Sequence, residues 1–466
     1  MDQATFKTFD TLANSSSVVV SELDIKKAVS KSPLNSYTIT WKDSSGEVLT
    51  PIYVNHTVGG SNTTSVLLVN SSGAAYNGDS PVLTFTPTSS LLEYLHPNYK
   101  SSVVSINSSA NITLINDSIS NQVYKFNQKT GVKAYITPKV GSIRLSALSG
   151  DGKALIGTNY QEDGLMGLSN GFEIGSAGIT AFKLNSDGSF QELGNYYESS
   201  PCSWNSATTC ERYSMGSIAN DISSDSSTIV GTLMMLDKGA LSIGDLVKAL
   251  GFEAFIWDEN NGYKVLGSLS DSKTFSVANA VNSDGSIVAG TSEGDNGMEA
   301  FKWTSSEGMI GLGDLPGGEY FSSALDISND GGKIAGFSSV GADIYEAFKW
   351  TSEEGMTGLG RPSASESSLA MSISGDGNVV VGAMGNLKSR ALNAFRWDLD
   401  SGMQKVTSWL ATTGASVPSV LSLDIATSTN EDGSVVGGMS DGSAWLAFSG
   451  RGVVFPDTYT PTLVTP

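Results

Sequence analysis

The sequence is poor in the side chains on which most catalytic and metal chemistry depends. Its 466 residues include two histidines, two cysteines and only 27 lysines and arginines, against 47 aspartates and glutamates. A Ser-His-Asp triad would need His56 or His96, and neither lies in a nucleophile-elbow sequence. Two cysteines without a nearby histidine do not predict a zinc site. We therefore expect no catalytic residues, no metal site and no enzyme.

Charge and hydropathy exclude two further classes. The formal net charge of −20 repels phosphate backbones, so we expect no nucleic-acid partner. No apolar run approaches the roughly 18 residues of a membrane-spanning helix. The first residues, MDQATFKTFDTLANSSS, contain neither a basic nor an apolar segment and do not match a signal peptide.

What the sequence does contain is a repeat of about 46 residues, clearest from Ala300 to Phe337. In Ala300–Trp303 the large residues alternate with a lysine, as in a strand with one buried face. Further short strands follow, separated by glycine turns and by an Asp-Gly pair that suits a tight hairpin. Four short antiparallel strands per repeat, with aromatic and turn residues in phase, predict a β-propeller blade.

Two markers count the copies. An Ala-Phe pair begins at Ala181, Ala254, Ala300, Ala347, Ala394 and Ala447, and the Asp turn recurs at Asp151, Asp225, Asp284, Asp330, Asp376 and Asp432. Both counts give six, so the first prediction is a six-bladed propeller. A weaker half-copy begins at Val123, and the alternative is seven blades, one built from both ends of the repeat region. Asp225 is followed by serine instead of glycine, which predicts a wider or bulged hairpin there.

The repeats resemble the HAF-type extracellular repeat family. Met309 to Gly318 (MIGLGDLPGG) and Ala324 to Gly336 carry the likeness most closely, and it covers roughly residues 145–450. The resemblance implies a propeller that is secreted or displayed at a surface, and it names no ligand.

The chain divides into three predicted regions. Residues 1–120 lack the repeat and read as a small β-sandwich-like domain, 121–455 as the propeller, and 456–466 as a tail or linker. Asn-x-Ser/Thr sequons occur only in the first region and are either glycan sites or a product of its Ser/Thr/Asn-rich composition: Asn14, Asn55, Asn62, Asn70, Asn107, Asn111 and Asn116.

Insertions enlarge the first two repeats, and loops carry function more often than their scaffold does. One insertion gathers four aromatic residues that could bind a sugar or a protein, or pack over a blade edge: Tyr196, Tyr197, Trp204 and Tyr213. Cys202 and Cys210 in the same segment could close a small disulfide loop or remain free thiols. Residues 242–250 have the spacing of a short amphipathic helix.

No cofactor is expected, with Ca²⁺ as the one candidate. Turns such as Asp284-Gly285 could bind it, but the alternating acidic ligands of a calcium loop are missing, and Asx turns explain these aspartates more simply.

These observations favour a non-enzymatic extracellular or surface-displayed protein for recognition or adhesion. Its partner would be a surface glycan or protein, bound through propeller loops, and its oligomeric state is open. The first alternative is a bacteriophage virion protein that attaches to the host. The second is a glycan-acting hydrolase, which a pair of acidic residues facing the central channel would support.

Overall fold

The computed structural model describes the strand backbones of residues 19–21, 35–42, 48–58, 61–69, 82–90 and 166–167, a turn at 71–72, and residues 101–117, 122–136, 142–160, 179–202, 205–237, 250–271, 273–415, 422–440 and 443–456. Side chains at some strand ends in these ranges, and throughout the strands before residue 101, lie outside the description.

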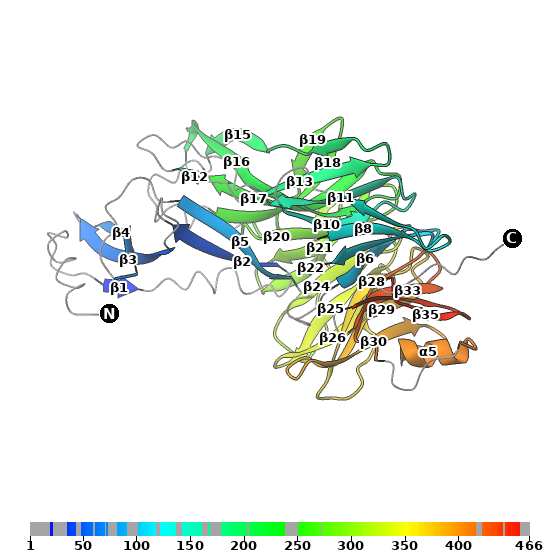
Figure 1. The fold of residues 1–466 in the computed structure, drawn as a ribbon. Helices are drawn as coiled ribbons and strands as arrows, with labels where there is room; N and C mark the ends of the chain where they lie inside the picture. The colour runs from blue at the N-terminus through cyan, green and yellow to red at the C-terminus, as the bar shows by residue number, and fades with distance from the viewer. Residues whose placement is uncertain are drawn as a thin grey trace.

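Seven antiparallel sheets follow one another from residue 101 to residue 454 and form a seven-bladed β-propeller (Figure 1). Blade 1 is β6 (Ser101–Ile106), β7 (Ile112–Asp117), β8 (Gln122–Asn127) and β9 (Lys133–Ile136); blade 2 is β10 (Ser142–Leu148), β11 (Ala154–Tyr160), β13 (Ile179–Asn185) and β14 (Phe190–Glu192); blade 3 is β15 (Tyr197–Cys202), β16 (Asn205–Ile222), β17 (Thr228–Asp237), β18 (Leu250–Asp258) and β19 (Gly262–Val265). Blade 4 is β20 (Ser276–Val281), β21 (Ile287–Glu293), β22 (Met298–Thr304) and β23 (Gly308–Gly311); blade 5 is β24 (Ser322–Ile327), β25 (Ile334–Gly341), β26 (Ile344–Thr351) and β27 (Gly355–Gly358). Blade 6 is β28 (Ser367–Ile373), β29 (Val379–Asn386), β30 (Ala391–Asp398) and β31 (Gly402–Lys405); blade 7 is β32 (Ile425–Thr429), β33 (Val435–Ser440), β34 (Ser443–Phe448) and β35 (Gly452–Val454).

We call the four consecutive strands of each blade a to d from the channel outward; in blade 3 these are β16 to β19, and β15 pairs with the first part of β16. Because neighbouring strands are antiparallel, the a–b and c–d turns lie on one face of the ring and the b–c loops and blade-to-blade connections on the other. The helix α5 (Val406–Thr412), the one helix within the described ranges, links blade 6 to blade 7.

The six-bladed prediction is wrong, because blade 1 carries neither marker used for the count. Its a–b turn is Asn107-Ser108-Ser109-Ala110, with serine in place of aspartate and alanine in place of glycine. The geometry is nevertheless that of the other turns: the Ala110 amide donates to the Asn107 carbonyl at 2.8 Å and Ala110 has a φ of 52°. In blade 5 the Gly331 amide likewise donates to the Ser328 carbonyl at 2.8 Å, with a φ of 71°.

The seven-bladed alternative had the right number but a different construction. No blade combines both ends of the repeat region, since each of the seven is built from one continuous stretch of the chain. The half-copy from Val123 supplies β8 and β9, and strands expected in the amino-terminal region, β6 and β7, complete that blade. The sheet pairing therefore extends the propeller across residue 120 to residue 101.

Blades 7 and 1 close the ring by packing and by side-chain hydrogen bonds. Strand β6 lies against β32, β33 and β34, and Val103 and Ile115 share a buried cluster with Leu446. The Thr427 hydroxyl donates to the Val103 carbonyl at 2.5 Å. The Ile106 amide donates to the Ser428 hydroxyl oxygen at 3.1 Å.

The repeated Ala-Phe pair and the repeated glycine are in direct contact on neighbouring strands of a blade. The ring of Phe301 in β22 lies over Gly290 in β21, where an added Cβ would be 2.8 Å from the ring and clash with the Val277 carbonyl of strand a. Blades 2, 3, 5 and 6 repeat this arrangement, at Gly157, Gly231, Gly336 and Gly382. Only glycine lets strand a approach strand b this closely.

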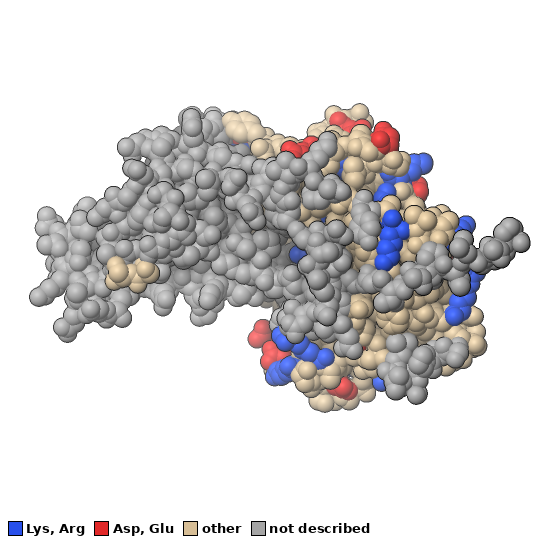
Figure 2. Space-filling model, viewed as in Figure 1, with Lys and Arg blue, Asp and Glu red and all other residues tan. Residues whose placement is uncertain are grey.

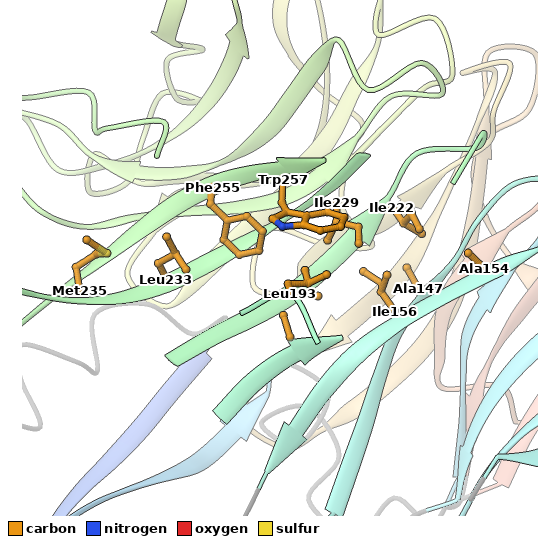
Figure 3. Packing of buried hydrophobic residues seen from close by; sticks show 12 residues of the cluster. Ala147, Ala154, Ile156, Leu193, Ile222, Ile229, Leu233, Met235, Phe255 and Trp257 are labelled. Carbon is orange, nitrogen blue, oxygen red and sulfur yellow. The ribbon is translucent and has the colours of Figure 1, made fainter. Parts of the chain in front are cut away.

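Aromatic side chains pack between blades, where they bury a large apolar area. Between blades 2 and 3, Phe255 and Trp257 of β18 lie with Ile229 and Leu233 of β17 in a buried cluster that includes Ile156 of β11 (Figure 3). Lysines of one blade lie over tryptophans of the next: Lys264 over Trp303, Lys302 over Trp350 and Lys349 over Trp397, at 4.9, 5.7 and 4.9 Å from the ring centroids.

The strands before residue 101 form a separate sheet. β1 (Val19–Ser21), β2 (Asn35–Lys42), β3 (Val48–Val58), β4 (Ser61–Val69) and β5 (Val82–Ser90) pair in the order β1-β3-β2-β5, with β4 on β3. β12 (Met166–Gly167), from the b–c connection of blade 2, pairs with β5 at the far end of this sheet. The β-sandwich assignment stays a prediction, because the segments between these strands lie outside the described ranges.

Candidate functional site: the central channel

The seven a strands surround a polar cavity of about 260 Å³ on the axis of the propeller. Every a strand contains a β-bulge at the same position, so one extra residue per blade is turned out of the ladder. These seven residues line the cavity: Val104, Ser146, Asn220, Asn279, Leu325, Met371 and Thr427.

The bulge residues give the channel two unlike sides. Ser146, Asn220 and Asn279 of blades 2 to 4 are polar, whereas Leu325 and Met371 of blades 5 and 6 are apolar. The amide nitrogens of both asparagines bind the next blade: Asn220 Nδ2 donates to the Ala278 carbonyl and Asn279 Nδ2 to the Ala324 carbonyl, at 2.8 and 2.7 Å. This orientation leaves the two Oδ1 atoms as acceptors without a hydrogen bond from the described residues.

Two carboxyl groups lie beside the bulges. Asp221 Oδ1 accepts from the Ile222 amide at 2.8 Å and Oδ2 from the Val281 amide of blade 4 at 2.9 Å. Asp326 Oδ2 accepts from the Ser372 hydroxyl and the Ile373 amide of blade 6, at 2.7 and 2.8 Å. Each aspartate thus bridges two blades while lining the channel.

Burial dominates the titration of these two aspartates. Desolvation raises the pKa of Asp221 to about 7, and the negative charge of Asp326 raises it further against the opposing effect of the backbone hydrogen bonds. Desolvation likewise raises the pKa of Asp326 to about 6. Both are half-buried, and the surface they leave accessible faces the channel, so the carboxyl groups touch channel solvent while protein surrounds them.

The a–b turns form the mouth of the channel. Backbone hydrogen bonds join successive turns, for example from Ser224 N–H to the Ser283 carbonyl and from Asn329 N–H to the Gly375 carbonyl, at 3.1 and 2.8 Å. Across the mouth, Asn329 Nδ2 donates to Glu431 Oε2 at 2.5 Å. No lysine or arginine is among the residues that line the cavity, although both charge signs are interspersed on the described outer surface (Figure 2).

The aspartates of the a–b turns form Asx turns. Asp330 Oδ1 accepts from the Gly332 amide and the Ser328 hydroxyl, and these bonds lower the pKa of its carboxyl group. Asp225 makes the same bonds to Ser227 and Ser223, and Ser226 adopts the left-handed conformation with a φ of 67°. The prediction of a wider or bulged hairpin at Asp225 is therefore wrong, because Ser226 adopts the same left-handed conformation as glycine in the other turns. Calcium binding stays a prediction.

Three of the four predicted binding residues, Tyr196, Tyr197 and the backbone of Tyr213, lie on the face of the b–c loops, where β15 and β16 project beyond blade 3 (Figure 1). Tyr196 is half-buried against the core, and its hydroxyl donates to Glu198 at 2.9 Å; burial first, and Glu198 second, raise its pKa to about 12. Tyr197 is 60% exposed and pairs with Tyr213 across the hairpin. Trp204 and the side chain of Tyr213 lie outside the described residues.

Other predictions have mixed outcomes. The side chains of Cys202 and Cys210 and residues 242–249 lie outside the description, so neither the disulfide nor the helix is tested. The register places Cys202 opposite Asn205 and Cys210 opposite Ser200, and no disulfide is found among the described residues. Asn107 is 2% exposed and holds the blade 1 turn, accepting from the Asn111 and Ile112 amides, which leaves no room for a glycan.

The sequence reasoning missed the channel residues. A usable signal was present when the repeats are aligned. Two a strands have aspartate directly before isoleucine, at Asp221 and Asp326, where Ala278 to Val281 has alanine. A charged residue at a position where other repeats have a small one indicates that its side chain has a different role.

Comparison with known proteins assigns the chain to no family. No protein-family model matches the chain, and no curated protein matches it. Among solved structures, it is similar to the β-propeller domain of the Trilobed protease from Pyrococcus furiosus, with 10% identity over 80% of this chain and 97% of that one and a TM-score of 0.42. It is also similar to an oligogalacturonate lyase in complex with manganese (13% identity, 79% and 92% covered, TM-score 0.43) and to TolB from Acinetobacter baumannii (11%, 72% and 82%, TM-score 0.35).

The expectation that the chain is not an enzyme has to be withdrawn. The solved structures to which the chain is similar include the oligogalacturonate lyase and the dipeptidyl peptidase 4 of Porphyromonas gingivalis, the latter at 9% identity and a TM-score of 0.39. Identities this low assign no activity, but the scarcity of histidine does not exclude one. Enzymatic status is therefore open. No helix in the described ranges is long and apolar enough to cross a membrane.

Proposed function

We propose that the protein is a recognition protein, secreted or displayed at a surface, that binds a surface glycan or protein through the b–c face of blades 2 and 3. The observation that carries the proposal is the extension of blade 3: β16 spans 18 residues, whereas its counterpart β20 spans 6. The hairpin made by β15 and β16 presents Tyr197 to solvent. An exposed tyrosine on paired strands offers a large contact area at low entropic cost.

The base of this hairpin is held by charged contacts. Arg212 of β16 forms an ion pair with Glu253 of β18, and its Nη1 lies 3.8 Å from Glu198 Oε2 in β15. Glu253 is nearly buried, and Tyr196 adds its hydrogen bond to Glu198. These contacts fix the hairpin on blade 3, and a fixed loop binds with a smaller entropic cost than a free one. The same surface would serve a protein displayed on a virion.

A glycan array and binding to whole cells test the proposal. The paired variant Tyr197→Ala/Tyr213→Ala is expected to lose at least about tenfold in affinity, since hot-spot aromatics contribute roughly 2 kcal/mol or more. The matched control is Leu399→Ala: Leu399 is 82% exposed but lies in the c–d turn of blade 6, on the opposite face. Unchanged binding by the tyrosine variant would overturn the placement.

A glycan-acting hydrolase is the second candidate, favoured by Asp221 and Asp326. Two channel carboxyl groups with pKa values of about 7 and about 6 can hold and release protons near neutral pH. The test is release of reducing ends from the glycans that the array identifies. Asp326→Asn should abolish that release and leave array binding intact, and a wild-type protein that releases nothing dismisses the activity.

A further inference from the structure

We infer that the channel is a second ligand site, separate from the hairpin, and that it binds an alkylammonium group. The inference does not depend on the proposed function. It starts from the size of the cavity: about 260 Å³ is below the roughly 300–1,000 Å³ of typical small-molecule pockets. A single small group on the propeller axis fits this volume.

Among its described lining residues, the channel offers hydrogen-bond acceptors and no cationic side chain. Oδ1 of Asn220 and Oδ1 of Asn279 are left without donors from the described residues, because their amide nitrogens are committed to blade-to-blade hydrogen bonds. Asp221 and Asp326 lie one residue after the bulges of blades 3 and 5, on either side of blade 4. An ammonium group has three donors and one charge, and so matches two amide oxygens beside two carboxylates.

The apolar side selects the rest of the ligand. Leu325 and Met371 line the channel in blades 5 and 6, the two blades that Asp326 joins. An aliphatic chain can lie against them while its ammonium group faces blades 2 to 4. A divalent metal fits less well: within the described ranges, no group of three His, Cys, Asp or Glu side chains could hold one. Neither the apolar side nor the set of ligands suits a hydrated metal ion.

The primary experiment is titration calorimetry on the full chain at neutral pH. The probes are n-butylamine and its neutral isostere n-butanol, followed by the peptides acetyl-Gly-Lys-Gly-amide and acetyl-Gly-norleucine-Gly-amide. We expect the amine to bind at least about tenfold more tightly than the alcohol, because the charge-assisted hydrogen bonds are lost in the neutral probe. Binding of the lysine peptide as well indicates a protein side chain as the natural source, and binding of butylamine alone indicates a free amine.

Channel variants locate the binding. Asp221→Asn and Asp326→Asn should each weaken butylamine binding about tenfold, whereas Glu192→Gln, an equal change of charge on exposed β14, should change it less than about twofold. Equal affinity for amine and alcohol in the wild type, or equal effects of the channel and surface variants, would overturn the inference. So would tighter binding of Ca²⁺ than of the amine.

A second pair of variants keeps the inference testable if the aspartate variants do not fold. Ser146 lines the channel, and its hydroxyl makes no hydrogen bond to the described residues. Ser146→Lys therefore places an ammonium group in the channel, and Ser146→Met places a neutral chain of similar length there. The lysine variant should have the higher melting temperature and should no longer bind butylamine. A lysine variant that melts below the methionine variant contradicts a site for an alkylammonium group.

Discussion

At the scale of single residues, the left-handed position of the a–b turn shows what the blade demands. Glycine occupies it in five blades, and the two exceptions, Ala110 and Ser226, adopt φ values of 52° and 67°. In this left-handed region of positive φ, a residue with a side chain is strained, whereas glycine is not. The turn keeps its conformation without glycine because side-chain hydrogen bonds within it and backbone hydrogen bonds to the turns of neighbouring blades hold it.

Replacing Ser226 with glycine should therefore stabilise the protein by about 0.5–1 kcal/mol, because the native φ of 67° no longer strains the backbone. Chemical denaturation measures the change. Ser352→Gly, at an exposed turn position that does not have positive φ, is the control and should be neutral or destabilising. A Ser226→Gly protein that unfolds at lower denaturant concentration would show that the serine side chain outweighs the strain.

Asp221 gives a prediction about pH. Its folded pKa of about 7 exceeds that of a model carboxyl, so its contribution to stability is fully present below about pH 4 and is lost as the pH rises through about 7. Asp221→Asn removes this loss. The stability of the variant relative to the wild type should rise by up to roughly 4 kcal/mol between about pH 4 and about pH 8.

Denaturation curves of both proteins across this pH range provide the measurement. Asp187→Asn is the matched control, because Asp187 is exposed and its pKa is lowered by bonds to Ser189; its relative stability should not rise with pH. A flat difference between Asp221→Asn and wild type would mean that Asp221 is not desolvated in solution.

At the scale of elements, a serine at the start of strand a joins each of blades 3 to 6 to the blade before it. Ser322 in β24 accepts from the Ala300 amide in β22 at 2.9 Å and donates to the Gly313 carbonyl at 2.5 Å. Ser276 and Ser368 make the equivalent pair of bonds at their interfaces. The Ser-x-Ala pattern of the repeat thus encodes contact between blades, while the Ala-Phe and glycine pattern encodes contact within one.

Ser322→Ala should cost about 1–3 kcal/mol, since it leaves the buried Ala300 amide and the Gly313 carbonyl without this partner. Thermal unfolding measures the loss. Ser352→Ala, on the exposed c–d turn of blade 5, is the control and should stay within about 0.5 kcal/mol of the wild type. Equal stabilities for the two variants would contradict the role assigned to the serine.

At the scale of the whole molecule, the ring depends on a junction that no shared sheet secures. Blades 1 and 7 are each complete, so their interface holds only by packing and by bonds such as that of Thr427 to Val103. The N-terminal sheet and the hairpin of β15 and β16 lie toward one face of the ring, and the a–b turns that form the channel mouth lie on the other (Figure 1). The two proposed ligand sites are therefore on opposite sides of the ring.

Thr427→Val should loosen this junction selectively, because it removes a partly buried hydrogen bond with little change in side-chain volume. Hydrogen exchange should accelerate in blades 1 and 7 more than in blade 4. Thr291→Val, which breaks the 2.6 Å contact of Thr291 with Ser323 between blades 4 and 5, is the control and should accelerate exchange there instead. A uniform response to both variants would show that the ring opens as one cooperative unit.

Much of the fold could be predicted from local pattern, and the errors have definite causes. The strand spacing and the glycine turns identified a propeller, since the Ala-Phe pair and the facing glycine make the same contact in blades 2 to 6. In blade 7, Trp445 takes this position over Gly438. The sequence pattern did not identify blade 1, because Ile115 pairs with Val103 where later blades have glycine and because Ala110 occupies the turn position. Packing against the neighbouring blades stabilises blade 1 with these residues, and a local sequence pattern does not show that packing.

The candidate sites divide in the same way. Tyr197 could be singled out from sequence, because an aromatic cluster in a polar insertion stands out against the repeat. Asp221 and Asp326 could not be recognised as a pair, since 105 residues separate them in the chain and only the ring brings both to one cavity.

By itself, the sequence determined the kind of unit and its internal contacts, because alternation, tight turns and glycine act over a few residues. Only the tertiary structure decided the number of blades, how the ring closes and what lines its axis. Those depend on contacts between residues far apart in the chain, such as Val103 with Thr427, whose free energy is realised only when all seven sheets are in place.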